Sequence, residues 1–221
     1  HADNHMFPVA TRARGRKMLS ARQVRGAYRK RGKSLRPGLV KASKKFKVNT
    51  GAEGILKCGA VGGGKVLVFH TIKGRWGGDA AADMYTNVMA KALHKHYPKA
   101  KSFVLLEDND PSGNLSSKGV KAKAAAKIKV FEIPKRSPEL NVLDYAIWSE
   151  IEKRMRAQER KFPASKRETR TDFEARLDRT ARNLGESYIN KAIMSMKRRC
   201  ELLHEAKGGL FEEKKRSRRP K

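Results

Sequence analysis

The sequence predicts an α/β domain in which a mixed five-stranded sheet is flanked by helices and followed by additional C-terminal helices. Two apolar, β-branched runs, 54–61 and 65–72, are joined by three consecutive glycines. Two further short apolar runs, 102–107 and 128–133, alternate with segments of helical spacing. With 38% hydrophobic residues in 221, the chain can bury one core, so we expect a single domain with basic extensions.

The sheet is predicted to begin with a short strand around Asp3 and to continue with an antiparallel hairpin. The hairpin joins 54–61 to 65–72 through Gly62-Gly63-Gly64, a composition typical of tight hairpin turns. Because no helix follows these glycines, they are more consistent with a turn than with a phosphate-binding loop. The first three elements are therefore strands.

Helices alternate with the remaining strands. Residues 80–97 show helical spacing and precede the strand 102–107, and a short helix at 116–126 precedes the strand 128–133. Another helical pattern begins at Asp144. The resulting order is three strands, helix, strand, helix, strand, helix, which is the order of the ribonuclease H-like fold.

We therefore place a ribonuclease H-like core at residues 1–160, with a basic insertion at about 10–50. Residues 161–210 are predicted to form C-terminal helices that pack on this core, and Ser165-Lys166-Arg167-Glu168 fits a helix capping box. Residues 211–221 are predicted to be a disordered basic tail that could serve as a nuclear import signal or bind phosphate.

The charge of the chain indicates a polyanionic partner. It has 52 Lys plus Arg against 22 Asp plus Glu, a formal net charge of +30, and residues 4–52 contain no acid. Nucleic acid is the leading candidate, although a structural RNA-binding protein of the ribosomal type would show the same balance. No apolar stretch approaches the roughly 18 residues that span a bilayer, so we expect no membrane partner. With a polyanion as the expected partner, we also expect no small-molecule substrate.

Two acidic residues stand at the edges of predicted elements. Asp108 follows the apolar run 103–106, and Asp144 opens a helix whose apolar side chains share one face. With Asp3 on the first strand, they occupy the three elements on which the ribonuclease H-like fold carries acids. Locally, Asp108 or Asp110 could instead end a strand with an Asx turn, and Asp144 could be an ordinary acid at a helix N-terminus.

Around these acids the chain resembles the mariner-type transposases of cut-and-paste DNA elements. Asp108-Asn109-Asp110-Pro111 resembles the second catalytic block of the family, and the segment 137–144, Ser-Pro-Glu-Leu-Asn-Val-Leu-Asp, resembles the third. Between Asp108 and Asp144 lie 35 residues, close to the spacing of the family. Residues 2–7 are similar to the first block, and 195–209 resemble the segment that closes the catalytic domain.

The resemblance implies a catalytic domain of the type that uses three acids, here Asp3, Asp108 and Asp144, to hold two Mg²⁺ or Mn²⁺ ions. It implies metal-dependent DNA strand cleavage and strand transfer in the nucleus, hence DNA transposition, recombination and integration by a transposase acting as an endonuclease. The partner would be DNA, with a possible homodimer on paired element ends. We expect DNA contacts from the basic residues Lys135, Arg136, Arg29, Lys30 and Arg31.

The chain also departs from the family pattern. Many relatives carry a His after the Pro of the second block, whereas Ser112-Gly113-Asn114 stands here. A catalytically inactive derivative that only binds nucleic acid through its basic surface therefore remains an alternative. The family's paired helix-turn-helix domains would lie upstream of His1, so we expect sequence-specific binding of element ends to be missing from this chain.

Overall fold

The computed structural model describes residues 1–8, 54–134, 137–163 and 168–208. The predicted basic insertion at about 10–50 and the predicted tail at 211–221 lie outside these residues. The order of strands and helices predicted from the sequence is confirmed. The domain boundary placed at about residue 160 stays a prediction.

Three antiparallel strands form the centre of the molecule. They are β1 (Ala2–Pro8), β2 (Gly54–Gly62) and β3 (Lys65–Ile72), in the order β1-β2-β3. Gly63 and Gly64 form the two-residue connection between β2 and β3, with φ angles of 54° and 74°. Positive φ at both positions is what a tight hairpin turn of this kind requires, which explains the glycines and confirms the predicted hairpin.

A long helical segment follows the hairpin and leads into a parallel pair of strands. The segment consists of α2 (Gly78–Asp83), η1 (Met84–Met89) and α3 (Ala90–His96), of which η1 is a π-helix. The chain continues through β4 (Phe103–Leu106), α4 (Ser117–Ala125) and β5 (Ile128–Phe131). β4 and β5 pair in parallel, as expected for strands joined by a crossover helix.

The prediction of one five-stranded sheet is not confirmed. Among the described residues, hydrogen bonds join three strands in one sheet and two in another, and no ladder links β1 to β4. Apolar runs identify strands, but they do not specify which distant strand each one pairs with. The two sheets are nevertheless held together by a shared hydrophobic cluster that includes Val68 of β3, Phe103 of β4 and Ile128 of β5.

The last part of the described chain is helical. It comprises η2 (Pro138–Leu140, a 3₁₀ turn), η3 (Leu143–Ile147, a π-helix), α5 (Trp148–Glu159), α6 (Arg170–Arg182) and α7 (Glu186–Glu205). A capping box at α6 is formed by Thr169 and Asp172, and Thr169 directly precedes the first helical residue, where a hydroxyl can accept from the free N–H groups. The capping box predicted at 165–168 begins outside the described residues.

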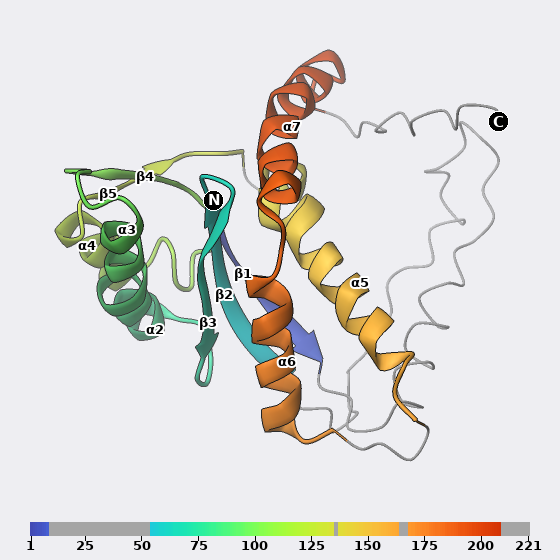
Figure 1. The fold of residues 1–221 in the computed structure, drawn as a ribbon. Helices are drawn as coiled ribbons and strands as arrows, with labels where there is room; N and C mark the ends of the chain where they lie inside the picture. The colour runs from blue at the N-terminus through green and yellow to red at the C-terminus, as the bar shows by residue number, and fades with distance from the viewer. Residues whose placement is uncertain (9–53, 135–136, 164–167, 209–221) are drawn as a thin grey trace, which may run out of the picture.

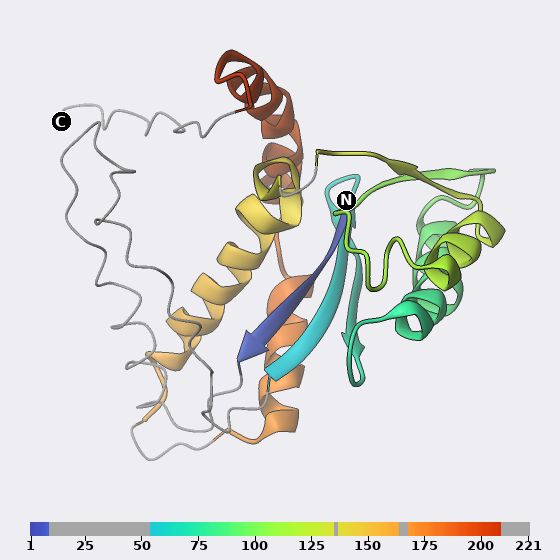
Figure 2. The ribbon, with the colours of Figure 1, turned by 180° about the vertical axis from the view of Figure 1, so that it is seen from behind.

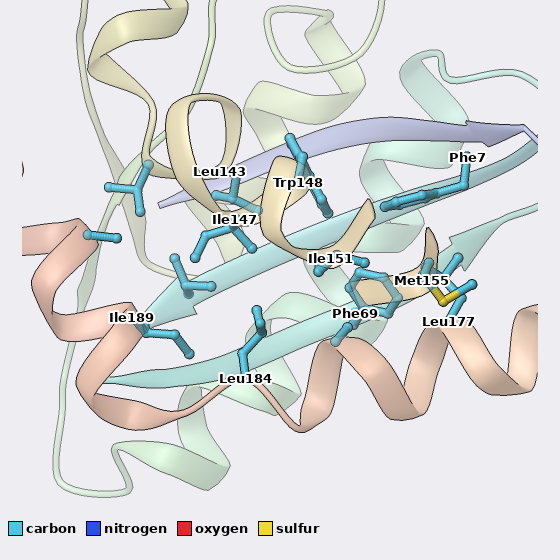
Figure 3. Packing of buried hydrophobic residues seen from close by; sticks show 14 of the residues in the cluster. Phe7, Phe69, Leu143, Ile147, Trp148, Ile151, Met155, Leu177, Leu184 and Ile189 are labelled. Atoms are coloured by element: carbon cyan, nitrogen blue, oxygen red, sulfur yellow. The ribbon is translucent and has the colours of Figure 1, made fainter. Parts of the chain in front are cut away.

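Helices cover both faces of the three-stranded sheet. α2, α3 and α4 lie on one side together with β4 and β5, and α5, α6 and α7 lie on the other (Figures 1 and 2). Each side has its own hydrophobic cluster. On the α5–α7 side, Phe7 and Phe69 of the sheet pack with Ile151 of α5 and Leu177 of α6 (Figure 3).

A buried cation fastens α6 to the sheet. Lys57 of β2 is only 1% exposed, and its ammonium donates to Thr71 at 2.5 Å, Asp178 at 2.6 Å and Glu174 at 3.1 Å. Because an unpaired buried charge is costly, these acceptors are needed to keep Lys57 inside. In the described part of the chain no helix is both long and apolar enough to cross a membrane.

Candidate active site

Asp3 is held on the central sheet by a tryptophan from α5. The indole N–H of Trp148 donates to Asp3 Oδ2 at 2.7 Å. Asp3 pairs with Gly59 of β2, and a Cβ on Gly59 would lie 2.5 Å from the Trp148 ring and 2.9 Å from Leu143. A glycine opposite Asp3 therefore leaves the space in which the tryptophan reaches the carboxylate. Trp148 is also buried in the hydrophobic cluster on this face of the sheet, so it both packs in the core and supports Asp3.

Asp108 lies just beyond the end of β4. The side-chain amide of Asn114 donates to Asp108 Oδ1 at 2.7 Å and to its carbonyl oxygen at 3.1 Å. The neighbouring Asp110 instead accepts from the backbone N–H groups of Ser112 and Gly113 at 3.3 and 3.1 Å. The Asx turn considered for this motif is thus made by Asp110, whereas the Asp108 carboxylate is held by Asn114.

Asp144 lies in the first turn of η3 and is exposed. The entry to η3 is stabilised by Asn141, whose side-chain oxygen accepts from the backbone N–H of Leu143 at 3.2 Å. The Asn141 amide also reaches the carbonyl of Ala2 at 3.4 Å, directly before Asp3. Asn141 therefore links the element that carries Asp144 to the strand that carries Asp3.

The three acids interact electrostatically. Burial and the negative charge of Asp144 raise the pKa of Asp3 from its ordinary value of 3.8 to about 7, although the Trp148 hydrogen bond acts in the opposite direction. Although Asp144 is exposed, partial desolvation of its carboxylate raises its pKa, and its interaction with Asp3 acts in the opposite direction. The pKa of Asp108 is raised by burial and by the charges of Asp110 and Asp144. Partial burial of carboxylates that lie close to one another produces this pattern.

One histidine belongs to the same neighbourhood. The His5 ring stacks on Trp148 with centroids 5.2 Å apart, and its Nε2 lies 3.2 Å from a carboxylate oxygen of Glu152. The charge of His5 acts to lower the pKa of Asp144. His5 follows Asp3 by two residues on β1, so both side chains lie on the same face of the strand.

A cleft of about 520 Å³ opens beside these elements. It lies between the loop after β4 and the segment that leads into η3. Its lining contains two of the predicted acids, and the lining residues are Asp108, Asn109, Asp110, Pro111, Ile133, Pro134, Ser137, Pro138, Asn141 and Asp144. Both motifs that indicated chemistry in the sequence therefore border one cavity, although they are separated by a helix and a strand.

The acids do not form a closed cage around a single point. Among the described residues, no three His, Cys, Asp or Glu side chains converge closely enough to hold one metal ion. Carboxylates are the oxygen ligands that Mg²⁺ takes, one or two at a time, while it keeps several waters. Asp3 lies close enough to Asp144 and Asp108 for their charges to raise its pKa.

Sequence reasoning missed the residues that support Asp108, namely Tyr85, Glu107, Asn114 and Lys123. The available signal was Glu107 itself, which continues the alternation that buries Phe103 and Leu105. The predicted DNA contacts cannot be placed, since Lys135, Arg136, Arg29, Lys30 and Arg31 lie outside the described residues.

No protein-family model matches the chain, and no curated protein matches it. Several solved structures do match it. The catalytic domain of Mos1 mariner transposase matches with a TM-score of 0.61 at 17% identity, covering 72% of this chain and 77% of that one. The Mos1 paired-end complexes with Mn and with Mg each match with a TM-score of 0.66 at 16% identity, covering 96% of this chain and 56% of the Mos1 chain.

These likenesses establish the fold. The chain has the α/β fold of a mariner transposase catalytic domain, as the resemblance of its acidic motifs predicted. It spans little more than half of the Mos1 chains in the paired-end complexes. The activity and partners of those larger proteins are therefore not carried over by the likeness itself.

Proposed function

We propose that this chain is the catalytic domain of a mariner-type transposase, which cleaves DNA strands and transfers them with the help of divalent metal ions. The observation that carries the proposal is the meeting of Asp3, Asp108 and Asp144, from three elements far apart in sequence, in one electrostatically coupled site. The fold in which they meet is that of the Mos1 catalytic domain. Charge alone would not distinguish this function from simple nucleic-acid binding.

All three acids take part in the proposed chemistry. Asp3, Asp108 and Asp144 would supply the carboxylate oxygens that hold two Mg²⁺ or Mn²⁺ ions. When bound, such ions activate the attacking water or 3′-hydroxyl and stabilise the leaving oxygen of the phosphodiester. The Mos1 paired-end complexes were solved with Mn and with Mg, which supports the choice of cation.

Trp148 and Asn114 keep two of these carboxylates in place by donating one hydrogen bond to each. The cleft bordered by Asp108 and Asp144 would admit the DNA backbone. We propose the basic residues Lys135, Arg136, Arg29, Lys30 and Arg31 as phosphate contacts. A homodimer on paired element ends and action in the nucleus complete the proposal.

The missing His of the second block favours a second candidate, an inactive derivative that binds nucleic acid through its basic surface. The residue that stands three positions after Pro111 is Asn114, which is buried and engaged with Asp108. The two candidates differ in one measurable property, because only the first requires metal-dependent cleavage.

A nicking assay on supercoiled plasmid with Mg²⁺ or Mn²⁺ tests the function. Asp108→Asn and Asp144→Asn should each reduce nicking at least about 100-fold, because losing a metal ligand removes several kcal/mol of transition-state stabilisation. DNA binding, measured by fluorescence anisotropy, should be retained in both variants.

Asp110→Asn is the matched control in the same motif. Its side-chain oxygen can still accept from the turn, so nicking should change only a few-fold. Equal losses from Asp108→Asn and Asp110→Asn would show that the wrong acid was assigned. Metal-independent DNA binding without any nicking would establish the inactive derivative instead.

A further inference from the structure

A chain of buried polar side chains runs from the interior to Asp108. Its members are all nearly inaccessible, at 2% exposed for Glu107, 3% for Tyr85, 4% for Asn114 and 4% for Lys123. Burying so many polar groups is unfavourable unless each finds a partner, and a fully satisfied network of this kind is rigid. It occupies the space between α4, the π-helix η1 and the end of β4.

The amide of Asn114 is the member that touches Asp108. Its Nδ2 donates to Oδ1 and to the backbone carbonyl of Asp108, at 2.7 and 3.1 Å. Its Oδ1 faces the Tyr85 hydroxyl at 3.1 Å. If the amide were turned over, its oxygen would face the carboxylate and its NH₂ group would face the phenol. The Asp108 carboxylate, which can only accept, therefore selects this orientation of Asn114, and the Tyr85 hydroxyl holds it by donating to the amide oxygen.

Tyr85 is fixed in turn from the interior. Its hydroxyl lies 2.6 Å from Glu107 Oε2, and the other oxygen of Glu107 accepts from the ammonium of Lys123. The same ammonium lies 5.0 Å from the centre of the Tyr85 ring. The phenol has one proton, which is shared between Glu107 and Asn114. The buried Lys123–Glu107 ion pair thus anchors the group that orients the amide.

The loop that carries Asn114 is also constrained at its other positions. Asp110 accepts from the backbone N–H of Gly113, and a Cβ at Gly113 would lie 2.1 Å from the indole nitrogen of Trp76. Ser116 then caps α4 by accepting from the Gly119 N–H at 3.1 Å. The backbone on both sides of Asn114 is therefore held, so the amide has little freedom to retreat from Asp108.

We propose that Asn114 is a positioning residue that presents the Asp108 carboxylate to a divalent metal ion, and that Tyr85 sets the orientation of its amide. This inference rests on the function proposed above. A carboxylate held by a hydrogen bond to one oxygen keeps its direction, and groups that support metal ligands in this way commonly contribute 10- to 100-fold in metal affinity. The Asn114 amide would therefore supply that contribution at Asp108.

The test measures binding of Mn²⁺ alone, without DNA, by the loss of the electron paramagnetic resonance signal of free Mn²⁺. Asn114→Ala should raise the Kd for Mn²⁺ by about 10- to 100-fold. Asn87→Ala is the matched control, because it removes an exposed amide that donates only to Asp83 on the same helical segment, at 2.7 Å. It should leave the Kd unchanged. Asp108→Asn provides the reference for a lost ligand.

Tyr85→Phe removes only a hydroxyl and keeps the ring over Lys123. It should weaken Mn²⁺ binding in the same direction as Asn114→Ala, and the double variant should bind no more weakly than Asn114→Ala, because both act on one amide. Circular dichroism in EDTA shows whether Asn114→Ala folds. If it does not fold, the Kd of Tyr85→Phe for Mn²⁺ alone decides whether the inference holds.

The outcomes separate this inference from the function on which it rests. If the wild-type chain binds no Mn²⁺, the proposed function is overturned and this inference with it. If the wild-type chain binds Mn²⁺ and Asp108→Asn does not, an unchanged Kd in folded Asn114→Ala overturns the positioning role alone. Additive losses from Tyr85→Phe and Asn114→Ala overturn the orienting role of Tyr85.

Discussion

At the scale of single residues, the raised pKa of Asp3 shows that an ionised carboxylate in this site lowers the stability of the folded protein. Burial is the main cause of its raised pKa, and the negative charges of Asp144 and Asp108 add to it. Its folded-state pKa of about 7 lies above the ordinary value of 3.8. A raised carboxyl pKa adds stability that is fully present below pH 3.8 and is lost as the pH rises through 7.

Asp3→Asn should therefore stabilise the metal-free domain at pH 8. The expected gain in the free energy of unfolding is on the order of 4 kcal/mol at pH 8 and clearly smaller at pH 5, because Asn carries no charge at either pH. Urea unfolding in EDTA at the two pH values measures it. An equal gain at both pH values, or a loss at pH 8, would contradict the assigned cause.

At the scale of elements, both π-helical segments of the described chain border the site. η1 carries Tyr85, and η3 carries Asp144. A π turn contains an additional residue relative to an α turn and thereby changes which side chains face a given direction, and such turns are frequent at functional sites. η1 lies inside a longer helix and η3 opens one, and in both cases the apolar spacing in the sequence predicts only the helix.

The contact between β2 and α5 gives a second prediction. Gly59→Ala should lower the free energy of unfolding by about 1–3 kcal/mol, because the new Cβ would overlap the buried rings and methyls of Trp148 and Leu143. Urea unfolding followed by tryptophan fluorescence is the measurement.

Gly185→Ser is the control for the glycine substitution. An added Cβ at this N-cap of α7 has nothing within 4 Å, and a serine there supplies the cap that the helix lacks. Its stability should be unchanged or higher by a few tenths of a kcal/mol. The packing argument fails if Gly59→Ala is as stable as the wild-type protein.

At the scale of the whole molecule, the two hydrophobic clusters and the surface charge have separate roles. Clusters on both faces of the central sheet make that sheet the common support of the site, since β1 carries Asp3 and the flanking elements carry Asp108 and Asp144 (Figures 1 and 2). The net charge of +30 does not contribute to these clusters, and it supplies attraction to the phosphates of a nucleic acid.

Binding to duplex DNA should therefore depend steeply on salt. Neutralising about six or more phosphates predicts a fall in affinity of roughly 10³-fold or more between about 50 mM and about 200 mM salt, because each contact releases condensed counterions. Anisotropy titrations on two unrelated duplexes check this, and the two should bind with similar affinity. Affinity that hardly changes with salt, or a strong preference for one duplex, would contradict an electrostatic mode of binding.

The sequence by itself determined the local features of this protein. Apolar runs predicted the strands, the three glycines predicted the hairpin, and the motifs around Asp108 and Asp144 predicted which ends of elements carry acids. All of these depend on neighbouring residues, whose spacing follows directly from strand and helix geometry. The meeting of the two acidic motifs at one cleft was also foreseen, but through the resemblance to a known fold rather than through spacing.

Only the tertiary structure decided the features that depend on distant partners. These include the division into two hydrogen-bonded sheets, the hydrogen bond from Trp148 to Asp3 across Gly59, and the chain from Lys123 to Asn114 that supports Asp108. The sequence does not show whether a Tyr or Asn is buried, and a buried polar side chain must find hydrogen-bond partners. Long-range packing determines which side chains are buried together, so it also determines which groups must satisfy one another.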